Sequence, residues 1–197
     1  GVLVSGQSTF RSLDDLFNFA RQRPGELTIA TNGVGTTPHV VLEELFTARG
    51  LRYIHVPYKG TSEQTIAVDA GQVMAGVNST GFAPFVDSGR LRLLATFAAR
   101  RSPRWPQVPT LKELGHNIVA MSPYGLAGPR GLPPVVVATL HEAFRKALFD
   151  PLFVHEIGKY DQEVDYLGPA EYGQWLKAEY AREKVAVERM GLSRAGP

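Results

Sequence analysis

The sequence predicts an α/β protein in which a mostly parallel sheet is flanked by helices, and three observations lead to this prediction. Short runs rich in β-branched residues alternate with amphipathic segments along the 197 residues. Helix-capping patterns precede several of the amphipathic segments. Glycine or proline separates many of the runs from the segments that follow them. With 44% hydrophobic residues, the chain is long enough for one substantial core or two small lobes.

The first half of the chain is predicted to form repeated strand–helix units. Strands are expected at residues 2–4, 27–30, 54–56, 73–77 and 91–97. Ser12 and Asp15 have the spacing of a capping box, so a helix is expected to begin there and to end before Pro24-Gly25. Its buried face is expected to comprise Leu13, Leu16, Phe17 and Ala20.

Three more helices are expected in this half. Thr37 is predicted to cap a helix with Pro38 at its first position, and Gly50 is predicted to end it. The buried stripe of that helix is expected to be Val41, Leu42, Leu45 and Phe46. A further helix is expected to run through Ile66 and Val68, and a short one to cover residues 82–86.

The second half opens with a connector in which Pro103, Pro106 and Pro109 crowd together. Thr110 and Glu113 repeat the capping-box pattern, which predicts a short helix closed by Gly115. Strands are then expected at residues 118–121 and 124–127, and helices at 135–149, 152–157 and 170–190.

Composition argues against several classes of protein. The 21 basic and 19 acidic residues are interleaved and leave a net charge of +2, which argues against a nucleic-acid footprint or a polybasic membrane anchor. No run approaches the length of a membrane span, and no secretory leader opens the chain. If the protein is exported, its leader is expected to have been removed or to lie outside this sequence. The absence of cysteine excludes disulfides, thiolate zinc sites and cysteine nucleophiles.

The glycine-rich loop at residues 31–39 is the most informative segment for function. A loop of this kind between a strand and a helix leaves backbone N–H groups unpaired at the positive end of the helix dipole. That arrangement favours a carboxylate or a phosphate. The same segment could instead be a tight turn whose glycines only relieve backbone strain, and on this segment alone the two interpretations stand equal.

Two other strands are followed by polar residues. Tyr58, Lys59 and Gly60 come after the strand at 54–56, and Asn78 and Ser79 come after the strand at 73–77. In an open α/β sheet, ligands collect at the carboxyl ends of the strands, so three polar strand ends predict a binding site at that edge. For Lys59 taken alone, a solvated side chain at the start of a helix is the simpler interpretation.

Known cofactor and catalytic motifs do not fit the chain. The loop reads Gly-x-Gly-x-x-Pro without an acidic residue at the end of the following strand, which argues against a dinucleotide site, and the P-loop spacing is absent. The five histidines lack metal-ligand spacing, and no Gly-x-Ser-x-Gly elbow is present. We therefore expect no cofactor, no metal and no catalysis; His39 could lend the anion site a hydrogen bond, although a capping or packing role is an equal interpretation.

These residues, in this order, resemble the substrate-binding proteins of tripartite tricarboxylate transporters, the Bug or TctC-like family. The matching stretches include Ser-Leu-Asp-Asp-Leu at 12–16, the block at 24–39, His-Val-Pro-Tyr-Lys-Gly at 55–60, Gly-Gln-Val at 71–73 and Gly-Arg-Leu-Arg at 89–92. They continue through 101–110, Tyr-Gly-Leu-Ala-Gly-Pro at 124–129 and Leu-Pro at 132–133. The resemblance runs from end to end.

The resemblance implies a type II periplasmic binding fold, in which two lobes enclose a small carboxylate and deliver it to the membrane components of a tripartite transporter. Residues 5–118 would form the second lobe, and residues 119–197 would return to the first lobe. The implied solute is a di- or tricarboxylate or an acidic amino acid, and the implied location is the periplasm. The ligand-binding residues expected from the loop and the strand ends are Asn32, Gly33, Val34, Gly35, Thr36, Thr37, His39, Tyr58, Lys59, Gly60, Asn78 and Ser79.

The chain departs from the family pattern in two ways. Met74 and Asn78 stand at the predicted strand 73–77 and just after it, where such proteins commonly carry aspartates, which bears on the solute that fits. About the first third of the family pattern also has no counterpart, so we expect one nearly complete lobe plus the carboxyl-terminal part of the other. Apolar surface left uncovered in this way is expected to cause self-association or an exchange of elements between chains. With one wall of the site absent, solute binding is expected to be weak or negligible.

Two other functions stay open at the level of sequence. A sensory or regulatory input domain that binds a small carboxylate could share this fold. An enzyme that uses Lys59 or His39 is the third interpretation.

Overall fold

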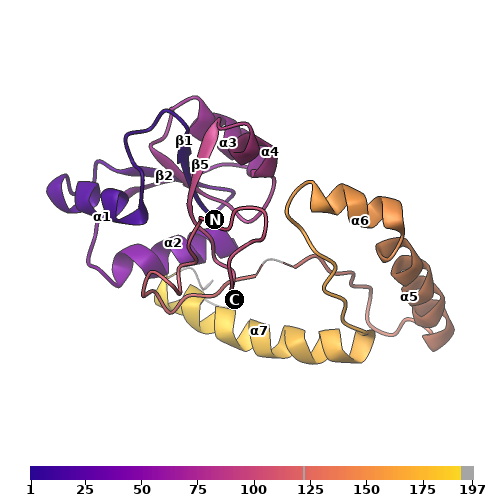
Figure 1. The fold of residues 1–197 in the computed structure, drawn as a ribbon. Coiled ribbons are helices and arrows are strands. Elements are labelled where there is room, and N and C mark those ends of the chain that lie inside the picture. Colours follow the sequence, from indigo (N-terminus) through magenta and orange to yellow (C-terminus); the bar gives the residue numbers. More distant parts are fainter. Residues whose placement is uncertain (122, 192–197) are drawn as a thin grey trace. The chain divides into compact units, whose positions relative to one another are not determined.

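The computed structural model describes residues 1–121 and 123–191, and the chain divides into two compact units, Gly1–Ser122 and Pro123–Pro197. Among the described residues, the first unit contains five strands and four helices, and the second contains three helices (Figure 1). The assignment of the two parts of the chain to lobes, with a boundary at 118/119, stays a prediction.

One sheet organises the first unit, with strand order β3-β2-β4-β1-β5. The strands are β1 (Val2–Ser5), β2 (Thr28–Thr31), β3 (Ile54–Pro57), β4 (Ala75–Val77) and β5 (Leu91–Ala95). β2 pairs in parallel with β3 and β4, whereas β1 pairs antiparallel with both β4 and β5. Four strands therefore share one direction and β1 runs against them. The predicted α/β fold is confirmed, and the sheet is mixed.

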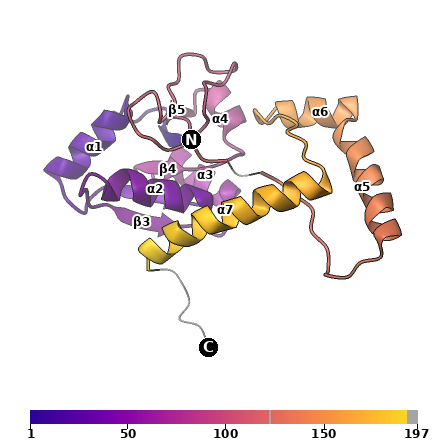
Figure 2. The same cartoon turned by 90° about the horizontal axis from the view of Figure 1, so that it is seen from below.

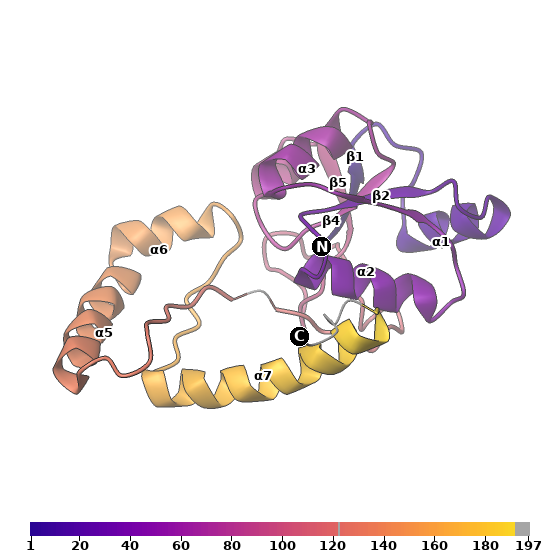
Figure 3. The ribbon, with the colours of Figure 1, turned by 180° about the vertical axis from the view of Figure 1, so that it is seen from behind.

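Helices cover both faces of the sheet (Figures 1 and 3). α1 (Leu13–Gln22) and α2 (Thr37–Thr47) contribute to one hydrophobic cluster, and α3 (Thr61–Asp69) and α4 (Ala83–Asp87) adjoin the other. In β1, Val4 belongs to the first cluster and Leu3 to the second, because successive side chains of a strand point to opposite faces. The sheet is thus buried on both sides.

The first two helices bury the residues expected of them. The capping box of α1 forms as predicted: the Asp15 N–H donates to Ser12 Oγ over 3.2 Å, and the Ser12 N–H donates to Asp15 Oδ2 over 2.9 Å. α2 begins one residue earlier than predicted, because Thr36 has the extended conformation of a cap and its carbonyl accepts the Val40 N–H. Thr37 is therefore the first helical residue. The buried stripes include the eight hydrophobic residues named above.

The predicted short helix after Pro109 does not form. Both capping-box contacts are present, since the Thr110 N–H donates to Glu113 Oε2 over 2.9 Å and the Glu113 N–H donates to Thr110 Oγ1 over 3.1 Å. The Leu111 N–H, however, donates to the Thr96 carbonyl just beyond β5, and Gly115 turns the chain with a φ of 82°. Too few residues remain between these two points for a helix, so the segment is a turn.

The strands predicted at 118–121 and 124–127 are also wrong, since neither described range forms a strand. A strand requires a ladder of hydrogen bonds to a neighbour. At 118–121 the only bond to the end of the sheet found in the described residues is that from the Ala120 N–H to the Phe97 carbonyl, 3.1 Å long. The described part of the second unit contains no strand to which 124–127 could pair.

The second unit contains α5 (Pro134–Leu148), α6 (Pro151–Gly158) and α7 (Pro169–Arg189), which confirms the three predicted helices (Figure 2). His141 Nε2 lies 2.6 Å from the Tyr166 hydroxyl, and the Tyr166 ring also contacts Phe149, so the segment before α7 is tied to α5. Neither α5 nor α6, both fully described, has a buried residue. Within the described residues, no helix has the length and apolar character that crossing a bilayer requires.

Candidate functional site

The carboxyl ends of β2, β3 and β4 lie next to one another, because these strands are parallel and β2 is between the other two. The Tyr58 N–H donates to the Thr31 carbonyl over 2.9 Å, which continues the pairing past the end of β3. A Cβ atom on Gly33 would lie 3.9 Å from the Tyr58 carbonyl oxygen. The loop after β2 and the segment after β3 are therefore in close proximity.

The loop after β2 offers three free backbone donors. The Gly33 N–H donates to Thr31 Oγ1 over 3.3 Å, and the Gly35 N–H donates to His39 Nδ1 over 3.0 Å. Within the described chain, the N–H groups of Val34, Thr36 and Thr37 have no hydrogen-bond partner. Two of the expected donors are thus used internally, and three remain at the start of α2.

The glycines of this loop are required by its conformation. Gly33 has a φ of 136° and Gly35 a φ of 75°, values that residues with a Cβ atom rarely adopt. The Thr36 hydroxyl closes the loop from inside, since it lies 2.8 Å from the Gly33 carbonyl oxygen and 3.0 Å from Asn32 Oδ1. Asn32 and Thr36 therefore shape the loop with their side chains.

His39 supports the loop from the first turn of α2. It is 6% exposed, and its ring stacks on that of His55 from β3, with centroids 4.1 Å apart. His55 Nε2 in turn lies 2.7 Å from Thr31 Oγ1. Burial lowers the pKa of both histidines, and the Glu43 carboxylate, 3.9 Å from His39 Nε2, offsets part of this effect. His39 therefore accepts a hydrogen bond from the loop as a neutral side chain.

The segment after β3 contributes a cation. Lys59 is exposed and has no ion-pair partner among the described residues, so its charge is available to an anion. Tyr58 is half-buried against the second hydrophobic cluster, and Gly60 is the N-cap of α3. Of these three residues, Lys59 is the exposed one, and Tyr58 and Gly60 are half-buried.

The segment after β4 is closer to the interior than its sequence suggested. Asn78 is fully buried; its Nδ2 donates to Thr65 Oγ1 over 3.3 Å, and its Oδ1 accepts the Thr80 N–H over 3.3 Å. Ser79 is half-buried. Asn78 thus supports this segment from beneath, and Ser79 is the more accessible of the two predicted residues.

Sequence reasoning missed the polar residues beneath the site. Gln64 and Thr65 of α3 are buried next to the strand ends, and His55 is stacked under the loop. The available signal was a pair of polar residues inside the apolar pattern of a helix. In the described residues, no three histidine, cysteine, aspartate or glutamate side chains gather as a metal ion would require.

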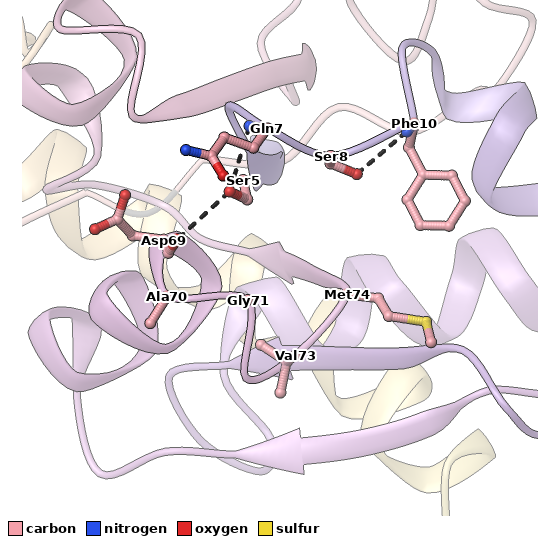
Figure 4. Close-up of a pocket in the computed structure, with 9 residues that line it drawn as sticks. All are labelled: Ser5, Gln7, Ser8, Phe10, Asp69, Ala70, Gly71, Val73 and Met74. Carbon is pink, nitrogen blue, oxygen red and sulfur yellow. Dashed lines mark hydrogen bonds between the residues drawn. The ribbon is translucent and has the colours of Figure 1, made fainter.

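A pocket of about 300 Å³ lies at the opposite edge of the sheet (Figure 4). It is formed by residues 5–10 at the end of β1 and beyond it, and by residues 69–74 before β4, among them Met74 from the predicted strand at 73–77. Asp69 borders the pocket and is paired with Arg90, so the pocket's own charged group is an acid. This edge is less suited to an anion than the edge that carries Lys59 and the free amides.

Comparison with known proteins identifies the family. The family model described as tripartite tricarboxylate transporter family receptor, TctC, matches residues 1–192. A UPF0065 protein from the gbd 5′ region of Cupriavidus necator is 40% identical over 195 residues, which cover 99% of this chain and 60% of the relative. BugT of Bordetella pertussis is 35% identical over 140 residues, or 70% of this chain and 43% of BugT.

Solved structures share the fold. A protein of R. palustris solved with adipate has a TM-score of 0.86 and 26% identity, and the match covers 96% of this chain and 64% of that one. MatC from Rhodopseudomonas palustris, solved with malate, has a TM-score of 0.84 and 23% identity over 94% of this chain and 65% of MatC, which bears on the fold alone.

The chain spans about 60% of the length of the first curated relative and about 65% of the solved structures. The family model nevertheless matches residues 1–192, which are nearly all of the residues of this chain. The protein therefore belongs to the tripartite tricarboxylate transporter receptor family, TctC, to which the Bug proteins are related.

Proposed function

We propose that this chain carries the anion-binding edge of a solute receptor for a small carboxylate. The observation that supports the proposal most directly is the set of three unpartnered N–H groups, those of Val34, Thr36 and Thr37, at the start of α2. The amino end of a helix carries a partial positive charge, and a carboxylate accepts such hydrogen bonds well. Lys59 adds a full positive charge from the neighbouring strand end.

The expected solute is a dicarboxylate, a tricarboxylate or an acidic amino acid. A relative at 26% identity was solved with adipate, which is a dicarboxylate. One carboxylate would bind the free amides, and the second would extend away from the loop. The remaining predicted ligand residues, including Tyr58, Gly60 and Ser79, are proposed to contact the rest of the solute.

The setting of this activity is proposed from the family. A receptor of a tripartite transporter would bind its solute in the periplasm and pass it to the membrane components. Such a role requires no catalysis, and we propose that this chain binds its solute without changing it.

Titration of ¹⁵N-labelled protein with adipate, followed by NMR, tests the proposal even where binding is weak. The amide signals of Val34, Thr36 and Thr37 should shift with adipate concentration, whereas adipamide, its neutral diamide, should shift them little. Shifts confined to residues 69–74, at the opposite edge, would contradict the proposal.

Substitution of Thr37 isolates one backbone donor. Thr37→Pro removes this N–H at the first helical position, where proline is tolerated, and Thr36 already has the extended conformation that precedes proline. Thr37→Ala keeps the N–H and loses the hydroxyl and the γ-methyl group. We expect about tenfold weaker adipate binding in Thr37→Pro and near-parental binding in Thr37→Ala. Equal affinity in the two variants would show that this amide does not bind the anion.

A further inference from the structure

Gln64 is a polar side chain in the hydrophobic interior, on the first turn of α3. It is 0% exposed, and its Nε2 donates to the Ala30 carbonyl over 3.2 Å and to the Val77 carbonyl over 3.0 Å. Ala30 lies near the end of β2 and Val77 is the last residue of β4, and these two strands are neighbours in the sheet. One side chain thus joins the two strands where their loops begin.

The orientation of this amide is fixed by its partners. Both acceptors are carbonyl oxygens, so the nitrogen must face them and the amide cannot be turned over. The cost is that Gln64 Oε1, although buried, has no hydrogen-bond partner among the described residues. An unpaired buried acceptor is unfavourable, and leucine or methionine would fill the same space without it. A polar residue kept at such a position indicates a role other than filling the core.

The polar contacts continue from Gln64 toward the surface. The neighbouring residue Thr65 accepts a hydrogen bond from Asn78 Nδ2, and Asn78 Oδ1 accepts one from the Thr80 N–H. Beneath Gln64, Gly76 leaves the space that the amide needs, since a Cβ atom there would lie 2.9 Å from Gln64 Nε2. The first turn of α3 is therefore linked to the segment that follows β4 as well as to the end of β2.

We propose that Gln64 is a positioning residue for the anion site. By joining the ends of β2 and β4, it fixes the distance between the loop at 32–37 and the segment at 78–80, so that both can contact one solute. The proposal rests on the proposed function, because the distance matters only if the two segments share a ligand. Gln64 itself does not touch the solute.

The test compares Gln64→Met with Gln72→Met, which makes the same change at an exposed position of the same unit. In Gln64→Met, without any ligand, we expect the amide signals of Val34, Thr36, Thr37 and Thr80 to move while those of Leu3 and Leu93 in β1 and β5 stay in place. We also expect about tenfold weaker adipate binding, the equivalent of about one hydrogen bond. A residue that only stabilised the core would lower the melting temperature and leave the loop signals unchanged.

Gln64→Glu provides a second readout if the methionine variant folds poorly. Above the pKa of the new carboxyl, a carboxylate oxygen in the place of Nε2 would face the two carbonyls and repel them. Below that pKa, the protonated group can donate one hydrogen bond again. The amide signals of the loop at 32–37 should therefore shift with pH in Gln64→Glu. The shift should be larger than in Gln72→Glu, the control that places a new carboxyl at an exposed position.

The outcomes separate the two proposals. If the parent chain fails to bind adipate, the proposed function fails for this probe, and the ligand-free signals still decide the role of Gln64. Loop signals in Gln64→Met that match those of Gln72→Met, or an absence of extra pH dependence in Gln64→Glu, would overturn the positioning role.

Discussion

The hydrogen bond from the Gly35 N–H to His39 Nδ1 can exist only while that nitrogen carries no proton. Burial is the main cause that lowers the pKa of His39, and the Glu43 carboxylate acts in the opposite direction. His55, stacked on His39, has a pKa lowered first by burial and then by His39 itself. The groups around His39 therefore favour its neutral form in the folded protein.

This arrangement predicts a dependence of stability on pH. Because the folded pKa of His39 is below its unfolded value of about 6.5, its contribution to the free energy of unfolding is complete above that pH. The contribution falls as the pH drops from about 6.5 toward the folded pKa. Urea unfolding at a series of pH values should show this loss, and the Gly35 amide signal should move over the same range.

His39→Asn separates the histidine from the other groups that titrate. The Asn amide oxygen can accept the Gly35 N–H but takes up no proton in this range. The part of the pH dependence that belongs to His39 should therefore disappear, and His55 should account for what remains. An unchanged stability profile in His39→Asn would contradict the assignment.

At the level of single residues, the sequence predicted where the glycine-rich loop lies but not which of its neighbours are buried. The loop at 32–37 was recognisable because its glycines fall between a strand and a helix. Whether Asn78 faced outward or inward could not be read from its position after a strand, since that depends on Thr65 across the α3 interface. Gln64 was missed for the same reason: a buried polar residue has meaning only once its partners are known.

At the level of elements, α3 packs closely on β4 at Gly76. A Cβ atom on Gly76 would lie 2.7 Å from Val68 Cγ2, closer than packed atoms allow. We expect Gly76→Ala to lower the free energy of unfolding by about 1–3 kcal/mol, the usual cost of overpacking. Urea unfolding measured by circular dichroism gives the value.

Gly60→Ala is the matched control for stability. Gly60 precedes α3, its φ of −178° is extended, and nothing lies within 4 Å of the space a Cβ atom would occupy. Because alanine caps a helix less well than glycine, this variant should lose some free energy of unfolding, but less than Gly76→Ala. A comparable loss of stability in both variants would mean that close packing at Gly76 is not the cause.

The helices were predictable because their signals are local. The capping box of α1 and the apolar stripes of α1 and α2 lie within a few residues of one another. The strands at 118–121 and 124–127 were predicted from composition alone, although a strand also needs a neighbour. The turn at Thr110 has all the local signals of a helix start, yet its Leu111 N–H is bonded to Thr96, fifteen residues earlier in the chain.

For the molecule as a whole, the main feature is the apolar surface of α5 and α6. Phe144 is 50% exposed, Leu152 77% and Phe153 42%, and neither helix, as described, buries a residue. About a third of each solved relative lies outside the part that matches here. Apolar surface of this kind generally associates with another surface.

We therefore predict that the 197-residue chain self-associates. Light scattering should give a mass above that of one chain, and the mass should rise with concentration. Phe144→Glu combined with Phe153→Glu should return it to the monomer. Ile66→Glu, which changes an exposed residue of α3, should have no such effect. A parent chain that stays monomeric would contradict the prediction.

The reversed strand β1 also determines when the sheet can be completed. Val2 pairs with Val77 on one side and with Ala95 on the other, so β1 is enclosed by strands that follow it by more than seventy residues. During synthesis, β1 must wait unpaired until β4 has left the ribosome, and its other edge stays open until β5 follows. Contacts so distant in sequence slow folding, and a chain halted before residue 91 would keep one edge of its sheet open to association with other strands.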